Sequence, residues 1–188
     1  MYIPSDDSFF FAEFLKNYFS KIKFKKKQNK LKKIKFLDIG TGSGILAEQA
    51  IKSGINLENI TALDIDKKSI SYVKKTIKGI KVIHSNLFSN INKKVKFDII
   101  TFNAPYLPRD KENKEPKDSQ LETTGGKRGD EISLKFLKQA KFHLNKGGKI
   151  FLLISSLTPK DKINKFNPKL LAEKKLFLEK LYILSFSA

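Results

Sequence analysis

The segment 38–44, Asp-Ile-Gly-Thr-Gly-Ser-Gly, has residue types and a spacing that suit ligand binding. Its glycines, Gly40, Gly42 and Gly44, occupy alternate positions, so the backbone can turn sharply and approach a ligand with no Cβ in the way. A helical run follows from Ile45, and its first turn would present free N–H groups to the same ligand. A dinucleotide-binding loop requires its third glycine where Ile45 stands, so this loop is predicted to hold another kind of ligand.

Polar side chains stand at or just beyond the ends of four short apolar runs. In chain order they are Asp38, Asp64, Asn86 and Asn103. Rossmann-like folds place a carboxylate at the end of the second strand, where it accepts hydrogen bonds from both hydroxyls of a ribose. Asp64 is the residue predicted for that role.

Short β-type runs alternate with helical runs along the chain. Strands are expected at residues 34–39, 60–65, 81–84, 97–102 and 149–155, and helices at residues 9–19, 45–52, 67–78 and 131–144. The final runs, 170–177 and 181–186, predict an antiparallel hairpin at the sheet edge. The pattern therefore predicts an α/β fold with a Rossmann-like, doubly wound, mostly parallel seven-stranded sheet. Ligands of such sheets lie beyond the carboxyl ends of the strands, so the polar residues above should converge.

Length and composition favour one domain over residues 1–188, of which 40% are hydrophobic. Residues 1–30 are expected to form an N-terminal helix and the start of a basic loop that spans 21–33. Residues 103–130 form a long polar loop of the kind that is usually functional, here a candidate substrate loop.

No apolar run reaches the roughly 18 residues of a membrane span, and no signal peptide is recognisable, so a cytoplasmic protein is expected. With no cysteine, thiolate catalysis and thiolate zinc sites are excluded, and no metal site is predicted.

The chain carries 38 Lys and Arg residues against 19 Asp and Glu, a formal net charge of +19. Such a surface attracts RNA, the ribosome or an acidic protein. Nearly all of these cations are lysine, as an AT-rich genome tends to encode, whereas phosphate readout favours the bidentate fork of arginine. A solvated basic surface without a dedicated partner is therefore the favoured interpretation. The exceptions, Arg109 and Arg128, both fall in the 103–130 loop.

The 38–44 loop resembles the D-x-G-x-G-x-G loop of S-adenosylmethionine-dependent methyltransferases. The resemblance implies S-adenosyl-L-methionine as cofactor and places Asp38 close to its methionine amino group. In that family an Asp after the third strand usually binds the adenine amino group. Asn86 stands there in this chain, followed by Leu87, and an Asn carbonyl can accept the same hydrogen bond.

Residues 102–106, Phe-Asn-Ala-Pro-Tyr, resemble the N-P-P-Y motif of methyltransferases that act on amino nitrogens conjugated to a carbonyl or an aromatic ring. Such a nitrogen is a poor nucleophile because its lone pair is delocalised, so the site must hold its protons and orient it. The Asn103 side-chain oxygen and the Ala104 carbonyl can accept those protons. Pro105 removes a competing N–H, and Tyr106 can pack on the planar group. The rate is expected to come from orientation and preplaced dipoles.

Three further stretches resemble the short eukaryal and archaeal members of the HemK/PrmC group of protein-(glutamine-N5) methyltransferases. They are Tyr-x-Pro-x-Asp-Asp-Ser at 2–8, Gly-Gly-Lys-Arg-Gly at 125–129 and the closing run 176–182. The resemblance covers nearly the whole chain and adds Ser8 to the residues expected around the cofactor. It implies methylation of the glutamine in the Gly-Gly-Gln motif of a class I peptide chain release factor, hence a role in translation termination. It also implies a heterodimer with a small zinc-binding activator subunit, which would cover apolar surface beside the third strand.

Other functions stay open at this point. An N6-adenine or N2-guanine methyltransferase acting on RNA or DNA shares the Asn-x-Pro-Tyr motif and suits the basic charge. A protein lysine methyltransferase is a third possibility. A basic RNA-binding module with a degenerate cofactor fold is less favoured, because such a module need not retain the whole set of glycines and strand-end polar residues. The 125–129 segment, and the lack of a recognisable target-recognition domain, favour a protein substrate.

Overall fold

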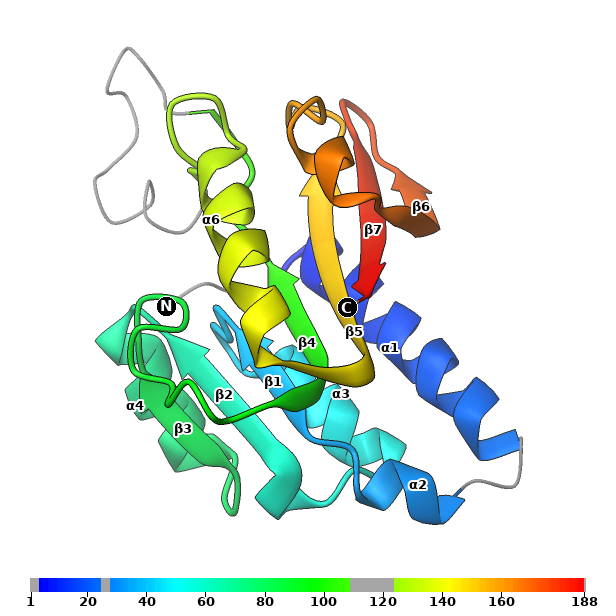
Figure 1. The fold of residues 1–188 in the computed structure, drawn as a ribbon, viewed down its shortest axis with the longest axis vertical. Helices are drawn as coiled ribbons and strands as arrows, with labels where there is room; N and C mark the ends of the chain where they lie inside the picture. The colour runs from blue at the N-terminus through cyan, green and yellow to red at the C-terminus, as the bar shows by residue number, and fades with distance from the viewer. Residues whose placement is uncertain (1–3, 25–27, 109–123, 188) are drawn as a thin grey trace.

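A computed structural model describes residues 4–24, 28–108 and 124–187. Seven strands form one sheet in the order β3-β2-β1-β4-β5-β7-β6 (Figure 1). The strands are β1 Phe36–Ile39, β2 Ile60–Asp64, β3 Lys81–His84, β4 Phe97–Asn103, β5 Leu144–Ser155, β6 Lys169–Lys175 and β7 Lys180–Ser187. The five neighbouring strands β3, β2, β1, β4 and β5 pair in parallel. Strand β7 pairs antiparallel with both β5 and β6. The predicted Rossmann-like, doubly wound sheet and its C-terminal antiparallel hairpin are therefore confirmed.

Helices cover both faces of this sheet. They are α1 Asp6–Phe24, α2 Gln28–Lys32, α3 Ile45–Ser53, α4 Lys67–Thr76 and α6 Glu131–Ala140, with 3-10 turns at Leu57–Asn59, Lys141–His143 and Ile163–Phe166. In Figure 1 α6 lies in front of the sheet, and α1 and α3 lie behind it. Within the described ranges no helix has both the length and the apolar character needed to cross a membrane.

The N-terminal region differs from the prediction. The first helix runs from Asp6 to Phe24, well beyond 9–19, and α2 occupies part of the segment 21–33 that was expected to be a basic loop. Leu31 of α2 is fully buried, and Ile22 of α1 packs against the same core. The many lysines in the sequence of this segment made it look like a basic loop, although lysine is a good helix former.

The boundary between α6 and β5 also differs. The predicted helix 131–144 ends at Ala140, and β5 begins at Leu144 rather than at residue 149. Leu144 pairs with Phe97 of β4, and the His143 ring stacks on Phe88 with 4.7 Å between ring centroids. Apolar residues at a helical spacing continue past residue 140, so periodicity alone placed the end of the helix too late.

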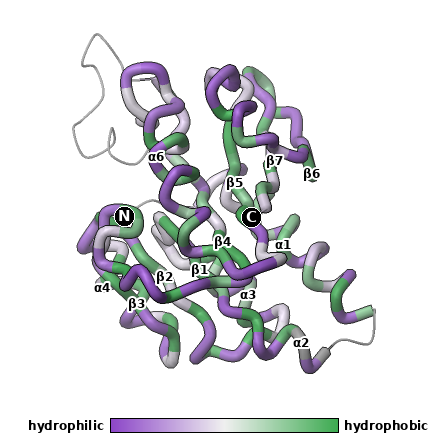
Figure 2. The backbone as a smooth tube through the Cα atoms, viewed as in Figure 1, coloured by the Kyte–Doolittle hydropathy of each residue, from purple (hydrophilic) through white to green (hydrophobic). Residues whose placement is uncertain are grey.

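Each central strand contributes to two hydrophobic cores, because neighbouring residues point to opposite faces of a sheet. One core joins Phe36, Ile60 and Phe151 to the helices α1, α3 and α4. The other joins alternate residues such as Leu37 and Ile100 to α6 and to the segment after β3. Figure 2 shows the hydrophobic residues gathered along the central part of the sheet.

The chain reverses its winding direction beside β1. From β1 it passes through α3 to β2 and then through α4 to β3, and it then returns across the sheet to β4 on the other side of β1. The carboxyl ends of β1 and β4 consequently lie next to each other, with Ile39 in register with Phe102. Doubly wound sheets bind their ligands at this kind of switch point.

Candidate active site

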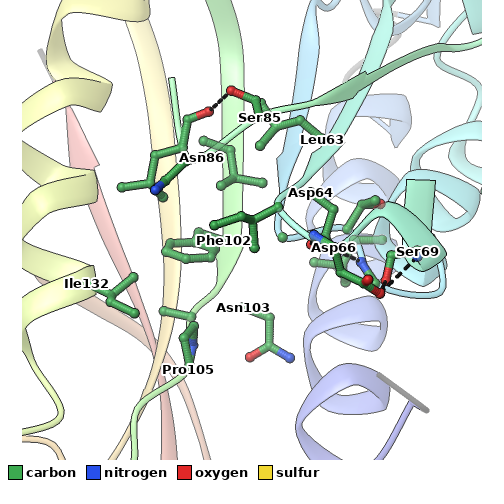
Figure 3. Close-up of a pocket in the computed structure, with 18 of the residues that line it drawn as sticks. Leu63, Asp64, Asp66, Ser69, Ser85, Asn86, Phe102, Asn103, Pro105 and Ile132 are labelled. Atoms are coloured by element: carbon green, nitrogen blue, oxygen red, sulfur yellow. Dashed lines mark hydrogen bonds between the residues drawn. The ribbon is translucent and has the colours of Figure 1, made fainter. Parts of the chain in front are cut away.

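A cavity of about 720 Å³ opens at the carboxyl ends of β1 to β4. This volume lies in the range of small-molecule sites, roughly 300–1,000 Å³. The predicted site residues on its wall are Ser8, Gly40, Gly42, Asp64, Asn86, Leu87, Asn103, Ala104, Pro105 and Tyr106. The two remaining ones, Asp38 and Gly44, are not part of the wall. Figure 3 shows Asp64 and Asp66 on one side of Phe102 and Ile132 of α6 on the other.

The glycine loop after β1 has the backbone that its sequence predicts. Gly40 has a φ of +61°, in the left-handed region that favours glycine, and a Cβ there would lie 3.0 Å from the Phe102 ring. Gly44 has a φ of +85°, and a Cβ there would lie 2.6 Å from Cδ1 of Ile77. Gly40 therefore borders the cavity, whereas Gly44 allows the start of α3 to pack against the chain that follows α4.

Asp38 lies beneath this loop and is fully buried. Its carboxylate accepts hydrogen bonds from the Thr41 hydroxyl at 2.7 Å and from the Thr101 hydroxyl at 3.0 Å. Burial raises the pKa of the Asp38 carboxyl to about 7, although these two hydroxyls act to lower it. In this structure Asp38 joins the loop to β4.

Asp64 lies at the end of β2, on the cavity wall, and is 8% exposed. One carboxylate oxygen accepts the N–H of Gly42 and the other accepts the N–H of Asp66, both at 2.8 Å. Burial raises the pKa of this carboxyl, while the two backbone donors lower it. Each oxygen has a second lone pair, so the same carboxylate that fixes the loop retains capacity to accept ribose hydroxyls.

The turn after β3 brings Asn86 and Leu87 to the cavity. The buried Ser85 hydroxyl donates to the carbonyl of Leu87 at 2.7 Å and accepts the N–H of Asn90 at 3.0 Å. Leu87 has a φ of +50°, which is unusual for a residue with a side chain, and it is 7% exposed. Ser85 thus holds a turn in which Leu87 is buried and Asn86 reaches the wall.

Asn103 lies at the end of β4 and contacts the first turn of α1. Its Nδ2 group lies 3.2 Å from Oδ2 of Asp7 and 3.4 Å from the Ser8 hydroxyl oxygen. Its Oδ1 atom is buried and has no hydrogen-bond partner among the described residues. In Figure 3 Asn103 and Pro105 lie below Phe102, and Asn86 lies above it. Asn103, a residue of the cavity wall, thus carries a buried acceptor that has no donor among the described residues.

The segment 124–129 braces the loop that follows Asn103. Leu107 pairs with Thr124, and the N–H of Gly125 donates to the Leu107 carbonyl at 2.9 Å. A Cβ at Gly125 would lie 2.6 Å from the Pro105 carbonyl oxygen, and a Cβ at Gly129 would lie 2.6 Å from that of Tyr106. Gly125 and Gly129 are therefore needed because two stretches of backbone touch there.

The substrate loop predicted for residues 103–130 is only partly described. Residues 109–123, including Arg109, lie outside the described residues, as does Tyr2 of the N-terminal motif. Arg128 lies 2.7 Å from Asp161 and 3.4 Å from the buried Asp130. Its guanidinium group therefore serves contacts within the protein.

Sequence reasoning missed three residues of the wall that could take part in function. Asp7, Ile132 and Lys135 all line the cavity. Asp7 stands in the N-terminal Asp-Asp-Ser motif beside Ser8, which was the available signal. Ile132 and Lys135 lie one turn apart on α6, which carries no polar motif in the sequence.

The chain is similar to known proteins over most of its length. The family model of the methyltransferase small domain matches residues 16–120. A Methanocaldococcus jannaschii protein, named as a candidate protein N5-glutamine methyltransferase, is 36% identical over 137 residues, covering 70% of this chain and 68% of that one. The release factor glutamine methyltransferase of Borreliella burgdorferi is 38% identical over 135 residues, covering 66% of this chain and 45% of that one. The chain thus spans about two thirds of the archaeal relative and less than half of the bacterial one.

A solved structure supports the fold. The 16S rRNA N2-guanosine methyltransferase of Thermus thermophilus, solved with S-adenosylmethionine and guanosine, has a TM-score of 0.66 at 18% identity, over 99% of this chain and 44% of that one. At this identity the likeness concerns the fold alone.

Sheet order, switch-point cavity and sequence relatives agree on one class of protein, a Rossmann-like methyltransferase. Because the family model covers more than half of its length, the chain belongs to the methyltransferase small domain family. The expected enzyme class is thereby confirmed.

Proposed function

We propose that this enzyme uses S-adenosylmethionine to methylate the side-chain amide nitrogen of glutamine in the Gly-Gly-Gln motif of a class I release factor. The observation that carries the proposal is the buried Oδ1 of Asn103, an acceptor without a protein donor among the described residues, on the wall of the cavity. An acceptor in this place suits a substrate that brings N–H groups. The names of the archaeal and bacterial relatives support glutamine as that substrate.

The residues on the cofactor side fit S-adenosylmethionine. The backbone of Gly40 and Gly42 lets the ligand approach closely, and Asp64 has acceptor capacity for the ribose hydroxyls. Asn86 and Leu87 would hold the adenine, and Ser8 would close the site from α1. Asp38 and Gly44 would contribute by shaping the loop from below.

When bound, the cofactor supplies an electrophilic methyl group on a sulfonium. The residues of this chain would orient the acceptor. Asn103 Oδ1 and the Ala104 carbonyl would each accept a hydrogen bond from one of its two N–H groups, and Tyr106 would pack on its plane. Held in this way, the nitrogen lone pair would point at that methyl group. Transfer would leave the electron pair of the broken C–S bond on sulfur, and the surplus amide proton would pass to water. Orientation of this kind can lower the barrier substantially without a general base.

Methyl transfer with a radiolabelled cofactor tests the proposal. The cognate release factor, its Gln→Ala variant in the Gly-Gly-Gln motif and total RNA would be offered side by side, with a zinc-binding activator protein supplied. Label on the wild-type factor and none on the variant is the expected result. Equal label on both factors, or label on RNA alone, would refute the glutamine assignment.

A nucleic-acid methyltransferase is the second candidate, and the net charge of +19 favours it. An adenine or guanine amino group presents the same kind of conjugated NH2 to Asn103. The RNA arm of the same assay separates the two functions. A lysine side chain brings a charged, non-planar amine, and label on a lysine of the release factor would identify that third alternative.

The activator subunit is also a proposal. Strand β3 lies at the edge of the sheet, and its Val82 and Ile83 are half-buried. The neighbouring Ile65 is 52% exposed. A small zinc-binding protein on this edge would cover these apolar groups in a heterodimer. Full methyltransferase activity of the purified chain alone would refute the need for such a partner.

We also propose that residues 1–188 form one methyltransferase domain that works in the cytoplasm, where translation termination takes place. Limited proteolysis tests the first part. A single protected core that includes both α1 and the β6–β7 hairpin is expected, whereas two separately stable fragments would contradict it.

A further inference from the structure

The side-chain amide of Asn103 has two ends with opposite hydrogen-bonding roles, and its surroundings treat them differently. The Nδ2 end faces Asp7 at 3.2 Å, while the Oδ1 end is buried without a partner among the described residues. An amide has almost the same shape in its two flipped orientations, so its neighbours decide which end faces the cavity. One neighbour must therefore enforce the orientation that the chemistry needs.

Asp7 has the property required for this task. A carboxylate offers acceptors and no donor, so it pairs with the NH2 end of the amide and disfavours the oxygen end. In the flipped orientation Oδ1 of Asn103 would face a carboxylate oxygen, and its NH2 group would face the N–H groups of the substrate. Both contacts would be repulsive. The flipped orientation therefore loses the hydrogen bond to Asp7 and gains two repulsive contacts, so its free energy is higher.

Asp7 is itself held in place by the start of α1. Its Oδ1 accepts the N–H of Ser8 at 2.5 Å and the hydroxyl of Ser5 at 2.7 Å, which leaves Oδ2 toward Asn103. The residue is 6% exposed. The positive end of a helix stabilises a carboxylate in its first turn. The orientation of Asn103 therefore depends on a helix that begins nearly a hundred residues earlier in the chain.

We propose that Asp7 is a positioning residue for methyl transfer: it fixes the Asn103 amide with Oδ1 toward the acceptor nitrogen. The proposal rests on the proposed function, because it assumes that Asn103 binds the acceptor NH2. It also gives a reason for acceptor selectivity. With its donor end bound to Asp7, Asn103 offers substrate only an acceptor, so a glutamine amide is accepted and a glutamate carboxylate is not.

The substitution Asp7→Asn tests this role with little change in shape. Asn at position 7 can still accept the N–H of Ser8, but it also brings a donor, so Asn103 can adopt either orientation. We expect kcat to fall roughly 10- to 100-fold, the scale on which misorientation of a reacting group acts. The Kd for S-adenosylmethionine and the melting temperature should stay close to those of the wild type.

Asp6→Asn is the matched control. Asp6 is the adjacent aspartate of the same helical turn, is exposed and pairs with Lys174 at 2.7 Å, and it does not line the cavity. The substitution removes the same charge one residue away and should leave kcat unchanged. A fall of kcat in both variants would overturn the proposal in favour of a general charge effect. A parallel loss of kcat, cofactor affinity and melting temperature in Asp7→Asn would overturn it in favour of a structural role.

A second measurement separates this inference from the proposed function. The side-chain amide signal of Asn103 in a nitrogen–proton NMR spectrum is assigned by its loss in Asn103→Ser. It should shift or split in Asp7→Asn and stay in place in Asp6→Asn. If the wild-type enzyme does not methylate the release factor, the proposed function fails, and this spectrum still decides whether Asp7 orients Asn103. An unmoved signal in Asp7→Asn would sink the positioning role even where release factor methylation is established.

Discussion

The two halves of the cavity differ in how their polar groups are satisfied. On the side of β1 and β2, the protein itself provides donors to both acids: Asp38 accepts two threonine hydroxyls, and Asp64 accepts two backbone N–H groups. On the side of β4, Asn103 has its donor end bound to Asp7 and its buried acceptor end unpaired within the described chain. On the first side both acids already have protein donors, whereas on the second side the buried acceptor has none among the described residues.

This difference indicates a division of labour. The acids of the first half shape the glycine loop before any ligand arrives, so their effect on the ligand is one of affinity. A buried polar atom without a partner costs about 1–3 kcal/mol, and Asn103 recovers that cost only when a substrate N–H reaches it. The second half should therefore act on turnover more than on cofactor binding.

The substitution Asn103→Ala should produce the largest effect and would test this division directly. We expect kcat to fall by about 100- to 1,000-fold, the range seen when one preorganised hydrogen-bonding group is removed from a reacting centre. Calorimetric affinity for S-adenosylmethionine should largely persist. Asn56→Ala, on an exposed asparagine beside Glu58, is the control and should keep both values. Equal loss of turnover and cofactor binding would mean that Asn103 is structural.

The substitution Asp64→Ala should do the reverse, with a smaller effect. Loss of hydrogen bonds to a carboxylate costs about 1.5–3 kcal/mol, so we expect the Kd for S-adenosylmethionine to rise roughly 10- to 100-fold. At saturating cofactor, kcat should recover most of its wild-type value. Asp64→Asn, which keeps one acceptor, should fall between the two. An unchanged Kd in Asp64→Ala would refute the ribose role. It would also contradict the assignment of cofactor affinity to this half of the cavity.

Much of this site could be predicted because parallel strands place their carboxyl ends together. Once residues 60–64 and 97–103 form strands, Asp64 and Asn103 must lie at the same edge, whatever separates them in the chain. The glycine loop can be recognised from local sequence as well, because glycines at alternate positions allow its left-handed backbone. Local pattern and sheet topology together were sufficient for these positions.

What could not be predicted depends on contacts between distant segments. Nothing in the sequence places Asp7 against Asn103, because that contact requires the orientation of a whole helix. Likewise, the burial of the Asp38 carboxylate depends on Thr101, a residue of β4 that donates a hydrogen bond to it from the neighbouring strand. The need for Gly125 appears only when the Pro105 carbonyl lies beside it.

The buried carboxyl of Asp38 gives a third prediction, which concerns stability and not activity. Its pKa is about 7 in the folded protein because of burial, against an ordinary value of 3.8. Between these values the folded protein retains a proton that the unfolded chain has lost. Below about pH 4 both states are protonated, so the stabilising contribution of the neutral form is fully present. It is lost as pH rises toward about 7, with a slope that approaches 1.4 kcal/mol per pH unit for one proton.

Urea denaturation of wild type and Asp38→Asn between pH 4 and 8 would measure this contribution. The difference in unfolding free energy between the two proteins should change across that window, because the asparagine has no proton to lose. Thr101→Val removes a hydroxyl that lowers the pKa, and it should extend the wild-type decline to higher pH. Parallel pH profiles for wild type and Asp38→Asn would mean that the carboxyl titrates alike in both states. The Asp38 carboxyl beneath the glycine loop would then be less shielded from water than its hydrogen bonds indicate. Its contrast with the unpaired acceptor of Asn103 would be weaker.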